Sequence, residues 1–427
     1  MFQIQPDNTI FIILSFEGPD IYSLAGGLGI RATELGRALA QMGFESHLFF
    51  VGDPYKPPLE LTLEEKFILH RCCQQISINH PAGVYENERS KILNYESTLP
   101  RCLVTNVIKP AVKSGKKAVI LAEEWHTAST VINIQSFLKE QSLDKDVIIF
   151  WNVNNTYSLD RINWRSLTES AVITTISRYM KQIMAQWGLN PLIIPNGIPS
   201  RSLKKINYFQ TSKIRNIFKD KLFMLKVGRY DPNKRWIMAV EALAEIKKRN
   251  KNAILVIRGG KEPHRYDILR KAESLGLKVK SLETEKGDFE TLCTLLSENS
   301  SFDILELSFF VPEEILRILY HAADAVLANS LHEPFGLVGL EVMAVSGIVL
   351  TGATGEDYAE SFENSIVVET SNPKEIAVYV MDLLMDSKLK EKIRKNAYNT
   401  AKLYTWDNVI YKLFKKLEFV IMSGIKG

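Results

Sequence analysis

Short apolar runs that alternate with segments of helical periodicity constrain the fold of this chain more than any other feature. The first run, IFIILSF at residues 10–16, is rich in β-branched and aromatic residues. A strand buried on both faces of a parallel sheet has this pattern, because helices cover both faces. Directly after it, AGGLGIRATELGRALAQMG carries apolar residues at helical spacing and ends in Gly43, a suitable C-cap. This stretch therefore predicts a strand, a glycine-rich loop and a helix.

The same alternation continues through the rest of the chain. Residues 53–100 are the exception, and we expect them to be irregular because they are rich in polar residues, Pro and Tyr. Regular alternation of strand and helix predicts two doubly wound α/β domains with parallel sheets. Further strands are expected at 45–51, 117–121, 147–152, 171–176, 222–227, 253–258, 304–307, 325–328, 348–351 and 366–369, with helices at 237–248, 266–274, 312–321 and beyond 373.

Chain length and one proline-containing segment predict the domain boundary. The chain has 427 residues, more than one hydrophobic core usually organises. The segment IIPNGIP at 193–199 holds two prolines and a glycine, which suits a hinge. We predict Rossmann-like domains at 1–197 and 198–403. The basic amphipathic segment at about 404–427 is expected either to pack back on the first domain or to lie on a membrane surface.

Composition excludes several classes of protein. Hydrophobic residues make up 46% and charged residues 24%, which is ordinary for an ordered domain. A net charge of +4 gives no support for nucleic-acid binding, although a pI near 8.6 allows peripheral contact with an anionic membrane. The four cysteines form neither a CxxC pair nor a disulfide framework. The seven-residue apolar run is too short for a signal core or a membrane span, so we expect a cytoplasmic protein.

The stretch at 329–347, NSLHEPFGLVGLEVMAVSG, predicts a compact binding site at a strand end, a tight loop and a helix start. Unpaired N–H groups and the positive end of the helix dipole suit a phosphate there. Glu333 in the loop and Glu341 on the helix would repel a phosphate, so each is expected to accept hydrogen bonds from sugar hydroxyls. By pattern alone, a surface loop without a ligand explains the stretch equally well.

Other candidate residues also follow predicted strands, where doubly wound sheets bind ligands. Gly26 and Gly27 would let backbone amides approach an anionic ligand, although a tight turn without a ligand is the commoner outcome. His126 lies in EEWHTA after the strand at 117–121. A lone histidine in such a place is more often structural than catalytic.

The order of these motifs resembles the GT-B glycosyltransferases. A glycine loop after the first strand is followed by a hinge, by GRYDPNK after the first strand of the second half, and by HEPFGLVGLEVMAVSG. The chain is most similar to the retaining family-4 enzymes, the relatives of glycogen synthase and sucrose synthase. This resemblance implies an interdomain cleft and transfer of a hexose from a UDP-, GDP- or ADP-sugar to a saccharide or lipid-linked acceptor. It implies no required metal or other cofactor, and a front-face displacement. It says nothing of oligomeric state.

Roles in the second half are implied position by position. Arg229 and Lys234 match the basic pair that contacts the donor diphosphate, where positive charge stabilises the leaving group. Glu333 matches the residue that contacts hydroxyls of the donor sugar, and Glu341 the one that binds the nucleotide ribose. The loop amides would come from Phe335, Gly336 and Leu337.

In the first half, Gly26 and Gly27 match the loop that closes over the donor phosphates, and His126 matches the histidine that contacts the 6-hydroxyl of the sugar. The resemblance thus names His126, Arg229, Lys234 and Glu333 as the catalytic set. The triplet Asp144-Lys145-Asp146 formally fits a DxD metal motif, but it precedes a strand instead of ending one, so we expect no metal site.

The chain departs from the family pattern in three places. TGATGEDYAE at 351–360 replaces a GG-containing turn, Glu124 stands where Asp is common, and residues 259–311 offer no clear contact for the nucleotide base. A glycoside phosphorylase or sugar-nucleotide epimerase on the same fold, and a non-catalytic nucleotide-sugar-binding protein, are the alternatives.

Overall fold

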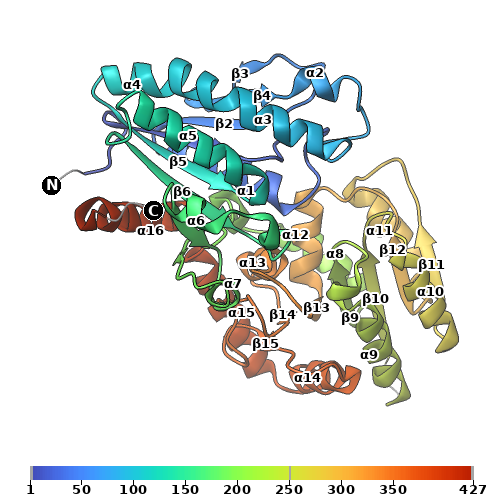
Figure 1. The fold of residues 1–427 in the computed structure, drawn as a ribbon. Helices are drawn as coiled ribbons and strands as arrows, with labels where there is room; N and C mark the ends of the chain where they lie inside the picture. Colours follow the sequence, from blue (N-terminus) through green and yellow to red (C-terminus); the bar gives the residue numbers. More distant parts are fainter. Residues whose placement is uncertain (1–2, 250–251, 425–427) are drawn as a thin grey trace. The chain divides into compact units, whose positions relative to one another are not determined.

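The computed structural model describes residues 3–249 and 252–424, which form two compact units (Figure 1). Unit 1 comprises the chain up to Pro199 together with the segment from Thr405 onward, and unit 2 comprises Ser200–Tyr404. The chain therefore leaves unit 1 once and returns to it near its C-terminus. Of the helices described, none is long and apolar enough to cross a bilayer.

Unit 1 is built on an eight-stranded sheet with the order β3-β4-β2-β1-β5-β6-β7-β8. Neighbouring strands are parallel, apart from the edge strand β3, which runs antiparallel to β4. Every residue of β1 is buried, as its uniformly apolar sequence predicts. The strands are β1 (Thr9–Leu14), β2 (Glu45–Val51), β3 (Leu59–Leu61), β4 (Phe67–Cys72), β5 (Lys117–Glu123), β6 (Val147–Val153), β7 (Val172–Thr175) and β8 (Leu192–Ile193).

Helices connect these strands, and the last helix of the chain belongs to the same core. In α16 (Trp406–Ser423) the buried side chains recur at helical spacing, and the Phe414 ring stacks on Phe11 at 5.8 Å between centroids. This amphipathic segment thus packs within unit 1. The other helices are α1 (Gly27–Gln41), α2 (Gln74–Ser77), α3 (Glu88–Leu103), a π-helical turn (Val104–Ile108), α4 (Lys109–Lys113), α5 (Ala128–Glu140), α6 (Trp164–Thr168) and α7 (Arg178–Ala185).

The expectation that residues 53–100 are irregular is wrong, since β3, β4, α2 and most of α3 lie there. In β4, FILHRC, buried and partly buried residues alternate, so the strand lacks the continuous apolar run that marks its neighbours. In α3, Pro100 lies inside the helix and only a few positions are buried, which hides its periodicity.

Unit 2 is built on a seven-stranded parallel sheet with the order β11-β12-β10-β9-β13-β14-β15. Its core includes apolar residues of β9, β10 and β13 and the inner faces of α9 and α14. The bounds are β9 (Leu222–Val227), β10 (Ala253–Arg258), β11 (Val279–Leu282), β12 (Ile304–Leu307), β13 (Ala325–Ala328), β14 (Val349–Thr351), β15 (Ile366–Val367), α8 (Tyr208–Ile217), α9 (Trp236–Lys248), α10 (His264–Ser274), α11 (Phe289–Glu298), α12 (Glu313–Ala322), α13 (Leu337–Ala344), α14 (Pro373–Met385) and α15 (Ser387–Lys402). The predicted fold class, two doubly wound Rossmann-like domains, is confirmed.

Candidate functional site

Each unit places its candidate residues where the strand order reverses. In unit 1, β1 lies between β2 and β5, and in unit 2, β9 lies between β10 and β13. Helices leave such neighbouring strands in opposite directions, which opens a crevice at the carboxyl ends. Gly26 and His126 follow β1 and β5, and Lys234 and Glu333 follow β9 and β13. The topology alone therefore brings the candidates together in two groups, one in each unit.

Lys234 and Glu333 form an ion pair in unit 2. Ser330 Oγ donates to the same carboxylate oxygen at 2.9 Å, and Leu331 N donates to Asn233 O at 2.7 Å. The loops after β9 and β13 are thus joined by both backbone and side chains. The Lys234 and Glu333 side chains remain 30% and 17% exposed, so a ligand can reach them.

Arg229 is exposed on the same loop, which a buried tyrosine anchors. Tyr230 OH donates to Glu306 Oε1 at 2.9 Å, and Tyr230 N donates to Glu262 Oε2 at 3.0 Å. Arg265 in turn forms an ion pair with Glu306. This anchor was missed by sequence reasoning because Tyr230 and Glu306 are far apart in the chain.

The loop Phe335, Gly336 and Leu337 leads directly into α13. Gly336 has φ +82°, a left-handed conformation that favours glycine, and it forms the N-cap. Phe335 is buried with its ring 5.7 Å from that of Tyr358. Farther along α13, Glu341 Oε2 lies 3.4 Å from Tyr320 OH. Burial raises the pKa of Glu341 to about 7, with a contribution from Glu313.

A pocket of about 610 Å³ lies at the carboxyl ends of β11 and β12. It occupies the same edge of the sheet as the Lys234 and Glu333 loops, because all strands of this sheet are parallel. Its walls come from residues 284–288 and 310–315, and include Phe310 and several carboxylates. The strand β11 and the helix α11, which flank the loop that forms one wall, were not predicted.

In unit 1, the glycine loop binds a side chain of its own domain. Gly26 N and Gly29 N both donate to Glu17 Oε2, at 2.8 and 3.2 Å. These two amides are therefore engaged by a carboxylate of the same unit. Gly27 begins α1, and a Cβ added there would meet nothing of the described chain within 4 Å.

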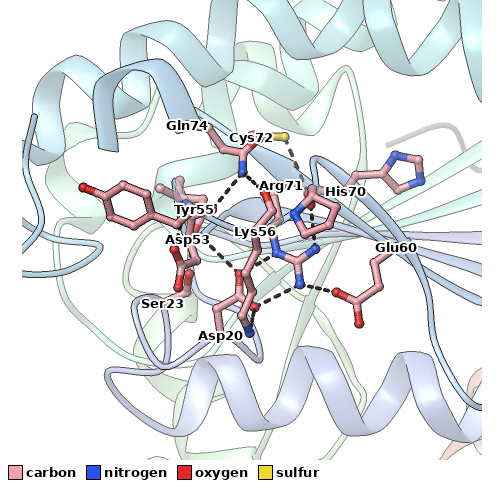
Figure 2. Close-up of polar contacts among 12 residues, drawn as sticks. Asp20, Ser23, Asp53, Tyr55, Lys56, Glu60, His70, Arg71, Cys72 and Gln74 are labelled. Atoms are coloured by element: carbon pink, nitrogen blue, oxygen red, sulfur yellow. Dashed lines mark hydrogen bonds and ion pairs between the residues drawn. The ribbon is translucent and has the colours of Figure 1, made fainter. Parts of the chain in front are cut away.

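A buried ion pair fixes the segment before the glycine loop. Figure 2 shows the Asp20 carboxylate facing the Arg71 guanidinium, with Arg71 Nε 2.7 Å from Asp20 Oδ2. Lys56 Nζ donates to Asp20 Oδ1 at 2.8 Å, and Asp53 N donates to Oδ2 at 3.0 Å. Burial opposes ionisation of Asp20, but these hydrogen bonds hold its pKa below the usual value. The loop after β1 is thus tied to β4 and to the β2–β3 connection.

His126 is buried between aromatic rings. Its ring lies 4.4 Å from that of Phe16 and 4.0 Å from that of Trp125, and its Nε2 is 2.9 Å from Glu88 Oε1. Burial lowers the pKa of His126, against the effect of Glu88. The neutral ring then donates from Nε2 to Glu88, which leaves Nδ1 as an acceptor. Within the described chain, Nδ1 has no hydrogen-bond partner.

Glu124 precedes this turn with φ +68° and is 2% exposed. Its Oε1 accepts a hydrogen bond from Asn154 N at 2.7 Å. Burial raises the pKa of Glu124 to about 8. A carboxyl group that holds its proton at neutral pH therefore stands beside His126.

The acidic and histidine side chains of the described residues form no metal-binding cluster. Across residues 3–249 and 252–424, no group of three or more His, Cys, Asp or Glu side chains is arranged to bind one. Asp144 and Asp146, in the turn before β6, belong to no such group.

Comparison with known proteins gives matches in both sequence and fold. The family model described as glycosyl transferases group 1 matches residues 208–400. An uncharacterized glycosyltransferase of Methanocaldococcus jannaschii is 27% identical over 60% of the chain. A lipopolysaccharide 1,2-N-acetylglucosaminetransferase of Salmonella typhimurium is 24% identical over 53% of the chain. The matched segments span only 62% and 56% of the lengths of these two relatives.

Solved structures match nearly the whole chain. Sucrose-phosphate synthase from Thermosynechococcus elongatus has a TM-score of 0.67 at 19% identity and covers 97% of this chain and 100% of its own. The Anabaena protein HepE, solved in complex with UDP, has a TM-score of 0.63 at 14% identity and covers 96% and 99%. At these identities the likeness establishes the GT-B fold.

Proposed function

The chain belongs to the glycosyl transferases group 1 family, and from this we propose that it is a retaining glycosyltransferase. It moves a hexose from a nucleotide-sugar donor to a saccharide or lipid-linked acceptor. The observation that carries the proposal is the joined pair Lys234 and Glu333 at the reversal point of the unit 2 sheet, with Arg229 exposed on the same loop.

The chemistry follows from the charges at this point. Arg229 and Lys234 bind the donor diphosphate and stabilise the negative charge that builds on it as the glycosidic bond breaks. Glu333 accepts hydrogen bonds from hydroxyls of the donor sugar, and Glu341 does so from the ribose. Lys234 contacts Glu333, so donor binding exchanges part of that contact for a phosphate. Retention proceeds by front-face displacement, and no metal is required.

The nucleotide base takes the pocket at the ends of β11 and β12. The pocket volume of about 610 Å³ accommodates a base and part of its ribose, and Phe310 offers a ring for stacking. HepE was solved with UDP, so UDP-sugars are the first donors to test, before GDP- and ADP-sugars.

Unit 1 contributes His126 and the glycine loop. His126 Nδ1, the acceptor left without a partner among the described residues, receives a hydrogen bond from the sugar 6-hydroxyl. Gly27 leaves room for the donor phosphates to approach the backbone. The acceptor is a saccharide or lipid-linked saccharide at the cytoplasmic face of a membrane, in line with the Salmonella relative named for lipopolysaccharide.

Release of nucleoside diphosphate from a panel of nucleotide sugars, with and without acceptors, tests the proposal. Lys234→Ala and Glu333→Gln should each reduce release by about 10²–10³-fold. The matched control is the exposed ion pair of Lys392 and Glu363 in the same unit, where Lys392→Ala and Glu363→Gln should leave release unchanged. Full activity in both site variants would overturn the assignment.

Three further measurements distinguish a metal-independent glycosyltransferase from a metal-dependent one, from a phosphorylase and from a non-catalytic binding protein. Activity that survives EDTA supports a metal-independent route, and activity abolished by EDTA and restored by Mg²⁺ or Mn²⁺ contradicts it. Cleavage of a disaccharide that depends on inorganic phosphate and needs no nucleotide would favour a phosphorylase. Binding of nucleotide sugars without turnover across the acceptor panel would favour a non-catalytic binding protein.

A further inference from the structure

The loop after β14, where TGATGEDYAE departs from the family pattern, packs directly against the loop that carries Glu333. Glu333 N donates to Thr354 Oγ1 at 2.9 Å, and Gly355 N donates to Glu333 O at 2.8 Å. The absence of a side chain at Gly355 permits this approach, since a Cβ there would lie 2.3 Å from Glu333 O. The backbone of Glu333 is therefore held by the Thr354–Gly355 segment.

Glu356 brings a second carboxyl group into the same small volume. It is 6% exposed, and its Oε2 accepts from Thr354 N at 3.2 Å. Thr354 Oγ1 lies 3.2 Å from Glu333 O and 3.3 Å from Glu356 Oε2. The other oxygen, Oε1, is buried and has no hydrogen-bond partner in the described chain. Thr354 thus links Glu356 to the backbone of Glu333.

The surrounding charges decide which of the two carboxyl groups holds a proton. Glu356 faces Glu333, Arg235 and Tyr358, while Lys234 is paired with Glu333. Burial, and then the charge of Glu333, raise the pKa of Glu356 to about 7. The buried carboxyl group of Glu356 and the partly exposed carboxylate of Glu333 repel each other when both are ionised. Below neutral pH, Glu356 is therefore the neutral member of the pair.

We propose that Glu356 is a positioning residue for Glu333: Thr354 links it to the Glu333 backbone, and in its neutral form it lets the Glu333 carboxylate stay beside Lys234. An ionised Glu356 keeps its hydrogen bonds from Thr354 but repels the Glu333 carboxylate, so contact with the donor sugar is lost as pH rises above neutral. This inference rests on the proposed function, because it takes Glu333 as the contact to the donor sugar. It assigns a role to the segment that motif comparison leaves unassigned.

The pH profile of kcat/KM with the nucleotide sugar that gives turnover tests the proposal. Wild type should lose about tenfold per pH unit above the ionisation of Glu356. Glu356→Gln, which is neutral at every pH, should match wild type within about threefold near pH 6 and move the alkaline fall up by at least about one unit. Glu360→Gln makes the same chemical change at an exposed position of the same loop and should keep the wild-type profile. An alkaline fall unchanged in Glu356→Gln would overturn the proposal.

Two variants of Thr354 test the link itself. Thr354→Val removes the hydroxyl at constant shape, and it should raise KM for the nucleotide sugar about tenfold while leaving the affinity for the free nucleoside diphosphate unchanged. Thr354→Ser keeps the hydroxyl and should restore KM. Equal loss of affinity for both ligands would indicate a merely structural role and contradict the proposal.

Thermal unfolding of the ligand-free protein separates failure of this inference from failure of the proposed function. The folded pKa of Glu356 lies above the usual value of 4.5, so stability is lost as pH rises from about 4.5 to about 7. Glu356→Gln cannot ionise and should not lose this stability. The Tm difference between the variant and wild type should therefore be several degrees larger at about pH 8 than at about pH 5. If no nucleotide sugar is turned over, the proposed function fails. If the Tm difference does not widen with pH, the inference about Glu356 fails.

Discussion

The two units present their candidate residues in opposite ways. In unit 1 the loop after β1 is pinned by buried groups of its own domain, with Glu17 bound to Gly26 N and Asp20 bound to Arg71. In unit 2 the polar groups Lys234 and Glu333 pair with each other and stay partly exposed. A ligand can replace the second kind of contact with little rearrangement, whereas the first kind resists change. Unit 1 therefore supplies a rigid surface, and unit 2 supplies groups that can exchange partners.

Breaking the buried ion pair should have the largest effect and should act on stability. Asp20→Ala leaves Arg71 buried with one counter-ion fewer, which should lower the free energy of unfolding by about 3–5 kcal/mol. Chemical denaturation measures the change. Lys56→Met removes the partner that is 46% exposed and should cost less than about 1 kcal/mol. Equal effects of the two changes would show that the Asp20 pair is not what fixes this loop.

Removing a partly exposed group of unit 2 should have the opposite effect: a large loss of activity and little loss of stability. Lys234→Ala should lower kcat/KM by about 10²–10³-fold, equivalent to about 3–4 kcal/mol of transition-state stabilisation. The free energy of unfolding should change by less than about 0.5 kcal/mol, as for most partly exposed positions. A large loss of stability would mean that Lys234 has a structural role. Unit 2 would then not differ from unit 1 in the way that we propose.

Glu124, the buried carboxyl group beside His126 in unit 1, should make the stability of the protein depend on pH. The pKa of Glu124, about 8, lies above the usual value of 4.5, so its contribution to stability is present below about pH 4.5 and lost as pH rises to about 8. Glu124→Gln should therefore be more stable than wild type by about 3–5 kcal/mol near pH 9, and the difference should vanish near pH 4. Urea denaturation at the two pH values measures it. A constant difference would show that Glu124 does not titrate in this range.

The smallest effect is expected at the start of α1. Gly27→Ala meets open space and gains helix propensity, so stability should stay the same or rise by up to about 1 kcal/mol. If donor phosphates approach this backbone, its KM for the nucleotide sugar should rise by about threefold to tenfold. Gly29→Ala, whose Cβ would lie 3.0 Å from Gly18 O, is the comparison and should lose stability instead. An unchanged KM for Gly27→Ala would remove the glycine loop from the proposed donor site.

The fold could be predicted from sequence because its signal is local. Apolar runs such as residues 10–14 of β1 and 222–225 of β9 mark buried parallel strands. The loops after these and similar strands locate Gly26, His126, Lys234 and Glu333 at strand ends. The strand β4 escaped because alternate burial gives a weaker pattern. Short-range sequence patterns thus predict the strands that are buried on both faces, and they miss a strand such as β4 that is buried on one face only.

The contacts that hold the candidate loops in place could not be predicted, because they join residues far apart in the chain. Asp20 meets Arg71 across 51 positions, and Tyr230 meets Glu306 across 76. Many carboxylates in the chain could have partnered Arg71, and only the packed fold selects Asp20. The same holds for Glu356, whose closeness to Glu333 depends on two loops from neighbouring strands.

The return of the chain to unit 1 has a consequence for biosynthesis. Trp406, Val409 and Leu413 of α16 are part of the same buried cluster as Phe11 and Leu48. A ribosome releases these residues about two hundred positions after Pro199, which takes on the order of ten to forty seconds at usual elongation rates. The N-terminal domain therefore waits for its last helix while Ser200–Tyr404 can already fold. Nascent unit 1, although made first, is the part that needs protection by chaperones.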